Sequence, residues 1–198
     1  AMGLSYFIWG KLDEASASSR KAIELDPDDF IAFWTLGRIH FTNGELEKAL
    51  GPFKRVIELK PGFYAAYADL AQTCAGLGRH EEAELASRQL LELLPNYLLQ
   101  NPDDSRARMY YAITLAEKGF KDDAIREGAK ALELSPGDPM MLYNCACLYS
   151  QLGEVERAID TLREAIAGGY ENFGWMKHDP DLDALRSDPK FIALIDGR

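Results

Sequence analysis

The sequence predicts an all-α protein made of stacked antiparallel helical hairpins, and three observations support this. A set of landmark residues recurs at a spacing of 34 residues, each copy divides into two amphipathic halves, and glycine and proline recur at the ends of those halves. A fixed period of this length is typical of a stacked repeat array, in which each unit buries its apolar face against its neighbours. We therefore expect a helical solenoid.

Residues 28–61 define the pattern, and adding 34 to each position finds it again in residues 62–95. Residues 1–27 carry its truncated start, and after a slip at residues 96–101 two further copies follow, at 102–136 and 137–170. A proline closes each copy except the last, where Tyr170 stands instead. Residues 1–170 are thus expected to form the repeat array and residues 171–198 a capping segment.

Each half of the copy at 28–61 has helical spacing of its apolar residues. Phe30–Thr42 is expected to be the first helix, and Asn43-Gly44 ends it because glycine adopts the left-handed conformation of a helix C-cap at low cost. Glu45–Leu59 is expected to be the second helix. Pro61 closes the unit, since proline lacks the N–H that would continue a helix.

Small residues recur where the two helices of a hairpin must approach closely. One column lies in the first helices and another in the second helices, and large side chains are expected to interlock around both. The first column is Gly37, Ala71, Ala112 and Ala146, and the second is Ala15, Ala49, Ala83, Ala124 and Ala158.

The slip at residues 96–101 has two interpretations. It either extends the preceding helix by about two turns or forms a short hook that reshapes the surface there. Extension is expected to keep Leu98 and Leu99 near the apolar face of that helix.

The tail beyond Tyr170 departs from the repeat. Asn172–His178 is expected to be a loop anchored by Phe173 and Trp175. Two short helices are expected to begin at Asp179-Pro180 and Asp188-Pro189, because aspartate caps free N–H groups and proline suits the first helical position. The residues expected to cover the last hairpin are Leu182, Leu185, Phe191, Leu194 and Ile195.

The period, the glycine and alanine columns, the mid-repeat glycine and the closing proline together resemble the tetratricopeptide repeat family. This resemblance implies a right-handed superhelical solenoid of hairpins that binds partner segments on a concave face and rarely performs chemistry. The tail resembles one found in bacterial arrays of this family, often fused behind adenylate cyclase or serine/threonine kinase domains. The matching residues are Gly169-Tyr170, Trp175, His178-Asp179-Pro180-Asp181-Leu182, Leu185-Arg186, Pro189 and Phe191.

Composition narrows the classes of partner and compartment. The 198 residues carry a formal net charge of −10, which repels phosphate backbones and argues against nucleic acid as a partner. No apolar stretch approaches the roughly 20 residues that span a bilayer, so no membrane partner is expected. The three cysteines predict free thiols in a reducing, cytoplasmic setting.

The chain begins inside the repeat pattern, so further sequence upstream is expected, either more repeats or another domain. Tyr6, Phe7, Ile8 and Trp9 would then be partly uncovered. Exposed apolar residues of this kind favour self-association, and a homo-oligomer through the N-terminal helix is one possible assembly.

The sequence contains no residue pattern typical of a catalytic, metal-binding or cofactor-binding site, so no enzyme, metal or cofactor is expected. His40 occupies a core column, His80 follows a turn and His178 precedes a capping aspartate. Neither a metal-binding spacing nor a phosphate-binding glycine loop is present. Aspartate pairs near helix starts are explained by the helix dipole.

In the family architecture the first helix of each hairpin lines the concave surface. The candidate partner-binding residues on these helices are Trp34, Arg38, Phe41, Gln72, Arg106, Met109, Ile113, Tyr143, Asn144 and Cys147. Aromatic residues, Met and Arg are enriched among binding anchors. The trough is expected to take an apolar or amphipathic peptide, with Arg38 or Arg106 meeting a carboxylate. Alternatively, these side chains fill the space between successive first helices.

The sequence therefore predicts a non-catalytic protein–protein interaction scaffold that binds a peptide or partner segment. Two alternatives remain open: a structural module whose main contact is with itself, and the regulatory arm of a larger bacterial signalling enzyme.

Overall fold

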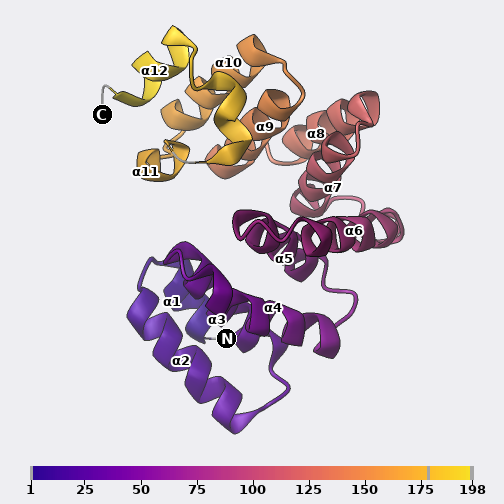
Figure 1. Cartoon of the computed structure of the whole chain (residues 1–198), viewed down its shortest axis with the longest axis vertical. Helices are drawn as coiled ribbons and strands as arrows, with labels where there is room; N and C mark the ends of the chain where they lie inside the picture. The colour runs from indigo at the N-terminus through magenta and orange to yellow at the C-terminus, as the bar shows by residue number, and fades with distance from the viewer. Residues whose placement is uncertain (1, 178, 197–198) are drawn as a thin grey trace. The chain divides into compact units, whose positions relative to one another are not determined.

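The computed structural model describes residues 2–177 and 179–196, and within them the secondary structure is helical, without strands. The chain folds into two compact units, residues 1–93 and 94–198, each a stack of helices (Figure 1). None of the described helices is both long and apolar enough to cross a membrane. The predicted all-α class is confirmed.

In the first unit, each hairpin consists of a first helix, here called helix A, and a second helix, helix B. Helix A also contacts the helix A of the next hairpin, as in the pairs α1–α3 and α3–α5. The elements of the unit are α1 (Met2–Ile8), α2 (Leu12–Leu25), α3 (Phe30–Thr42), α4 (Leu46–Leu59), α5 (Tyr64–Gly76) and the first part of α6 (His80–Gln100).

The second unit repeats this order and adds the tail. The hairpins α7–α8 and α9–α10 pack as in the first unit, and the 3₁₀ helix of the tail packs on α9. The elements are the end of α6, α7 (Ser105–Glu117), α8 (Lys121–Leu134), α9 (Pro139–Gln151), α10 (Val155–Ala167), α11 (Phe173–Met176), η1 (Pro180–Leu185) and α12 (Pro189–Asp196).

The mid-repeat glycines end helix A as predicted. Gly44 has φ of 73°, and the N–H of Glu45 donates to the carbonyl of His40 at 2.8 Å. This bond caps the last turn of the helix. The positive φ of Gly44 is unfavourable for a residue with a Cβ, which is why glycine occupies the turn. The other glycines with the same conformation in mid-repeat turns are Gly10, Gly78, Gly119 and Gly153.

Hairpin packing depends on the small-residue columns. A Cβ added to Gly37 would lie 2.5 Å from the ring of Phe53, so a larger residue cannot occupy this position without displacing the ring. In the column of the second helices Ala83 is only partly buried. The fully buried alanines of that column are Ala15, Ala49, Ala124 and Ala158.

Enlarging Ala49 to leucine is expected to destabilise the first unit by about 1–3 kcal/mol, because the added atoms have no space in the hairpin. Thermal unfolding followed by circular dichroism measures the effect. Ala75→Leu, on an exposed site of α5, is the matched control and should leave the midpoint nearly unchanged. Equal midpoints for the two variants would contradict the assigned packing.

The slip is resolved as a helix extension: α6 continues through Pro95 to Gln100. Leu98 is buried as expected, but Leu99 is 81% exposed, so its predicted position was wrong. Successive residues of a helix lie about 100° apart. Leu98 therefore shares a face with buried Leu94, whereas Leu99 points away from it.

The two tail helices begin where the sequence predicts them. Asp179 accepts a hydrogen bond from the N–H of Asp181, and Asp188 accepts one from Lys190. Leu182, Leu185, Phe191 and Ile195 are buried, while Leu194 is partly exposed.

The expected loop at 172–178 contains one helical turn, α11, because Met176 N–H bonds back to Asn172 and Lys177 N–H to Phe173. Met176 is the fully buried anchor of this turn, and Phe173 is partly buried. The side chain of Trp175 and the whole of His178 lie outside the part of the chain that the structure describes.

Candidate functional site: helix A surfaces of the two units

In the first unit the candidate residues lie on α1, α3 and α5. We call the surface formed by Phe7, Trp34, Arg38, Phe41 and Gln72 the Arg38 face. Several of its residues occupy equivalent positions of successive repeats: Phe7 and Phe41 are separated by one repeat, as are Arg38 and Gln72. Sequence reasoning missed Phe7 as a member of this face, although the 34-residue period would have found it.

Arg38 is the central cation of this face. Its guanidinium carbon lies 5.2 Å from the ring centre of Phe7 and 5.3 Å from that of Trp34. Within the described residues Arg38 has no carboxylate partner, whereas Arg55 and Arg79 each contact two acidic side chains. The rings hold the guanidinium by cation–π attraction and leave its hydrogen-bond donors available.

Trp34 packs against Arg38 and against the next hairpin, so only a small part of its side chain can contact a partner. The side chain is 7% exposed, its indole N–H donates to Asp69 on α5 at 2.6 Å, and Phe63 packs edge-on at 5.2 Å. These contacts join α3 to the next hairpin. Trp34 therefore acts mainly as a rigid platform for Arg38.

The rim of the Arg38 face is more accessible. Gln72 is exposed, while Phe7 and Phe41 are partly buried. A partly exposed aromatic beside a guanidinium suits a ligand that has both apolar atoms and an anionic oxygen.

In the second unit the candidate residues divide into accessible and buried groups. On α7, Arg106 is exposed, Ile113 is partly exposed and Met109 is buried. On α9, Asn144 is partly exposed, whereas Tyr143 and Cys147 are buried.

Tyr143 and Cys147 are buried because the tail covers them. Tyr143 O–H donates to Asp179 Oδ2 at 2.5 Å, and the Cys147 thiol lies 3.8 Å from the same oxygen. The ring of Tyr170 stacks on Tyr143 with centroids 4.2 Å apart. One turn further along α9, Gln151 donates to Asp181 at 2.8 Å. We call these six residues the tail latch.

Burial changes the acidities of the tail latch. It raises the pKa of Tyr143 and of Cys147 well above their usual values, with the charge of Asp179 adding to the effect. Both side chains therefore remain protonated near neutral pH and can donate. Burial, reinforced by the charge of Asp179, also raises the pKa of Asp181 to about 6.

The latch also groups a thiol and two carboxylates, which sequence spacing did not predict. One ligand atom from each of Cys147, Asp179 and Asp181 lies within 4.8 Å of the others. Both oxygens of Asp179, however, already accept hydrogen bonds from the chain. A cation would have to displace these donors, so the cluster is better described as a hydrogen-bonded anchor of the tail.

The two histidines that the structure describes, His40 and His80, lie at a turn and at a helix start. His40 Nδ1 lies 2.6 Å from Glu45 Oε2, beside the turn at Gly44. Hydrogen bonds from Lys48 and then His40 lower the pKa of Glu45. His80 is exposed at the first residue of α6. Neither environment places a nucleophile beside the imidazole.

The hairpins, their glycine turns and their helix A surfaces define an array of tetratricopeptide repeats, and the comparison with protein families agrees. Models of the family described as TPR repeat or tetratricopeptide repeat match residues 3–44, 64–97, 86–139 and 141–172. The chain is a tetratricopeptide repeat protein. Arrays of this kind generally act as non-catalytic scaffolds for protein–protein interaction, because stacked repeats present an extended surface.

A curated relative is similar over a short segment only. This relative, a chloroplastic protein of Arabidopsis thaliana, is 43% identical over 53 residues, which is 27% of this chain and 16% of that protein. The match thus spans less than a fifth of that relative's length.

Solved structures share the fold at low identity. A thermophilic TPR protein of Thermus thermophilus, TTC0263, is 22% identical with a TM-score of 0.66, over 88% of this chain and 92% of that one. PilF of Pseudomonas aeruginosa is 22% identical with a TM-score of 0.58, over 87% and 76%. MamA of Desulfovibrio magneticus RS-1 is 16% identical with a TM-score of 0.52, over 84% and 90%. These likenesses bear on the fold alone.

Proposed function

We propose that this protein is an interaction scaffold whose Arg38 face binds a partner segment carrying a carboxylate next to apolar residues. The observation that supports it most is the position of Arg38, held between the rings of Phe7 and Trp34 without an acidic partner among the described residues. A guanidinium fixed in this way loses little conformational entropy when it binds a carboxylate with two hydrogen bonds.

The other groups of the face fit the same kind of ligand. Phe7, which lies against Arg38, and Phe41, three residues further along α3, are both partly exposed and offer apolar contact. Exposed Gln72 offers a hydrogen-bonding amide. In the second unit, Arg106, Ile113 and Asn144 are the candidate residues that a partner segment can reach. Met109, Tyr143 and Cys147 are buried, and Tyr143 and Cys147 lie under the tail.

The test uses random peptides displayed on phage and selected on the immobilised full chain. Enriched peptides should share an aspartate or glutamate at a fixed distance from an aromatic or aliphatic residue. For a selected peptide, Arg38→Gln should weaken binding about 10- to 100-fold, the value of a charge-assisted hydrogen-bond pair. Arg38→Lys should retain part of the affinity because it keeps the charge but loses the planar donor pair.

Arg88→Gln is the matched control, because Arg88 is an exposed arginine on helix B of the same unit. Its ion pair with Glu84 has an N–O distance of 3.7 Å. It should bind the selected peptide as the wild type does. Equal affinities of the wild type and Arg38→Gln, with both chains helical by circular dichroism, would overturn the assignment of the Arg38 face.

A further inference from the structure

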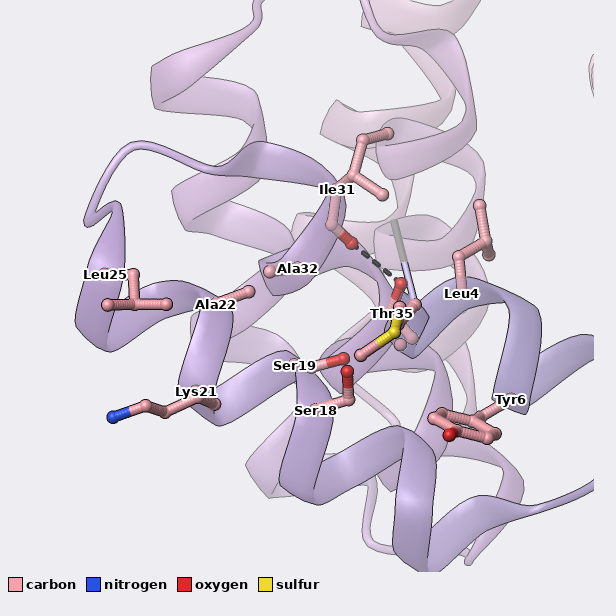
Figure 2. Close-up of a pocket in the computed structure, with 12 residues that line it drawn as sticks. Leu4, Tyr6, Ser18, Ser19, Lys21, Ala22, Leu25, Ile31, Ala32 and Thr35 are labelled. Carbon is pink, nitrogen blue, oxygen red and sulfur yellow. Dashed lines mark hydrogen bonds between the residues drawn. The ribbon is translucent and has the colours of Figure 1, made fainter.

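A cavity of about 410 Å³ lies in the first unit, between α1, α2 and α3. Figure 2 shows its wall, in which the Thr35 hydroxyl donates to the carbonyl of Ile31 at 2.8 Å. Nothing in the described part of the chain shows what occupies this cavity, so we assign it no ligand. The second unit, in contrast, contains a helix A surface together with the segment that covers it.

The tail of the second unit stands in the register of one further helix A. α9 begins at Pro139 and ends at Gln151, and 34 residues later α11 begins at Phe173 and η1 ends at Leu185. The packing agrees with this register, because η1 contacts α9 and α10 as α9 contacts α7 and α8. The tail therefore covers α9 in the way that the helix A of a following repeat would.

This covering element is interrupted, unlike the helices A before it. α3, α5, α7 and α9 are continuous helices of 13 residues, whereas α11 has four residues and η1 is a 3₁₀ helix of six. Pro180 explains the interruption, because it lacks the N–H that a continuous helix needs, and it disfavours the helical conformation in Asp179 before it. Asp179 has φ of −65° and ψ of 116°. Since 3₁₀ hydrogen bonds have poorer geometry than those of an α-helix, this element is intrinsically less stable than a continuous helix A.

Side chains replace backbone hydrogen bonds at the interruption. Arg186 donates to the carbonyl of Asp179 at 2.7 Å. Toward α9, the carboxylate of Asp179 accepts from Tyr143, and the carboxylate of Asp181 accepts from Gln151. Two neighbouring carboxylates thus join the tail to α9, in addition to its fully buried apolar residues. These apolar residues are Met176, Leu182 and Leu185.

The carboxylate of Asp181 makes this attachment depend on protonation. Burial and the surrounding negative charges raise its pKa to about 6, above the ordinary value of 3.8. When the tail leaves α9, water hydrates the carboxylate and its pKa returns to the ordinary range. The closed tail therefore binds the proton more tightly than the open tail. The titratable groups around Asp181 are Asp179 and Asp183 of the tail, Cys147 on α9 and Glu117 on α7.

We propose that the tail is a lid on the helix A surface of α9, which opens without unfolding of the hairpin α9–α10 and is more stably closed at acidic pH. Opening uncovers Tyr143 and Cys147, so that a partner segment can reach these two candidate residues. A short element with few backbone hydrogen bonds opens at a lower free energy than the whole unit unfolds. Because the closed tail takes up a proton as pH falls from 6 to 4, closing is favoured there, and opening is greatest above pH 6.

The test is the rate at which the Cys147 thiol of the full chain reacts with a pyridyl disulfide between pH 4 and pH 8. Each rate is divided by that of the same cysteine in the urea-unfolded chain at the same pH, which removes the effect of pH on the thiolate itself. Mass spectrometry of the digested chain assigns the reaction to each cysteine. The normalised rate of Cys147 is expected to rise about 10- to 100-fold from pH 4 to pH 8, as a pKa difference of about two units requires.

The chain supplies its own control in Cys145, which is fully buried on the same helix but lies beside Tyr149 and Arg157 instead of the tail. Cys145 should react at least tenfold more slowly than Cys147 at pH 8. Asp181→Asn should flatten the pH profile of Cys147, because the titrating carboxylate is gone. Asp183→Asn is the matched variant, at an exposed aspartate of the same 3₁₀ helix, and should leave the profile as in the wild type.

Equal normalised rates of Cys147 and Cys145 would overturn the proposal, since the tail would then open only when the whole unit unfolds. A flat profile of Cys147 in the wild type, or a profile that Asp181→Asn leaves unchanged, would also overturn it. These measurements involve neither Arg38 nor a peptide, so the proposal is tested separately from the proposed function.

Discussion

Replacing Asp179 by alanine is expected to lower the free energy of unfolding of the second unit by about 2–4 kcal/mol. The carboxylate accepts from Tyr143 O–H, from the thiol of Cys147 and from the N–H of Asp181. Its removal leaves the Tyr143 and Cys147 donors buried and unpaired, and removes the hydrogen bonds that join Asp179 of the tail to α9. Urea unfolding of the full chain, followed by circular dichroism and tyrosine fluorescence, measures the loss.

Asp160→Ala is the control for this prediction. Asp160 is exposed and pairs with Arg163 one turn away on α10, a type of contact worth about 0–1 kcal/mol. If Asp179→Ala and Asp160→Ala unfold at the same urea concentration, the tail latch does not stabilise the unit in the way described.

Replacing Asp181 by asparagine is expected to raise stability at pH 8 by about 1–3 kcal/mol, because one unit of pKa shift corresponds to 1.36 kcal/mol. Burial and the charge of Asp179 raise the pKa of Asp181 to about 6, above its ordinary value of 3.8. The folded state thus binds this proton more tightly than the unfolded state. Asparagine removes the buried charge and still accepts from Gln151.

The pH dependence follows from the same shift. Between pH 4 and 6 the folded wild type retains the proton and the unfolded chain releases it, so the contribution of Asp181 makes the wild type more stable as pH falls. The advantage of Asp181→Asn should therefore be full above pH 6 and disappear near pH 4. Unfolding midpoints measured from pH 4 to 8 test this, and a constant difference across the range would contradict the raised pKa.

The repeat period allowed most of the fold to be predicted. Gly44 and its equivalents end helix A because the same backbone conformation recurs in every hairpin, and Asp179 and Asp188 begin helices because their caps are local. Such features depend on residues close in sequence. Leu99 was misplaced because successive residues of a helix lie about 100° apart, and on α6 this rotation turns Leu99 away from the face that Leu94 and Leu98 share.

The covering of the helix A surfaces could not be predicted in the same way. The period places Tyr143 and Cys147 in the columns of Trp34 and Arg38, but it does not show which segment packs against them. In the first unit Arg38 stays accessible over two rings, whereas in the second unit the tail supplies Asp179 to Tyr143 and Cys147. Tyr170, in place of the closing proline, was the one local sign of this difference.

The most direct test of the proposed scaffold function is an NMR titration of the full chain with a peptide selected on it, following the indole N–H resonances of its tryptophans. Trp34 lies beneath Arg38 and donates to Asp69, whereas Trp9 is exposed at the end of α1. A saturable shift of the Trp34 resonance, absent in Arg38→Gln and without a matching shift of Trp9, is the predicted result. Binding that leaves Trp34 unperturbed would contradict the Arg38 face as the docking site.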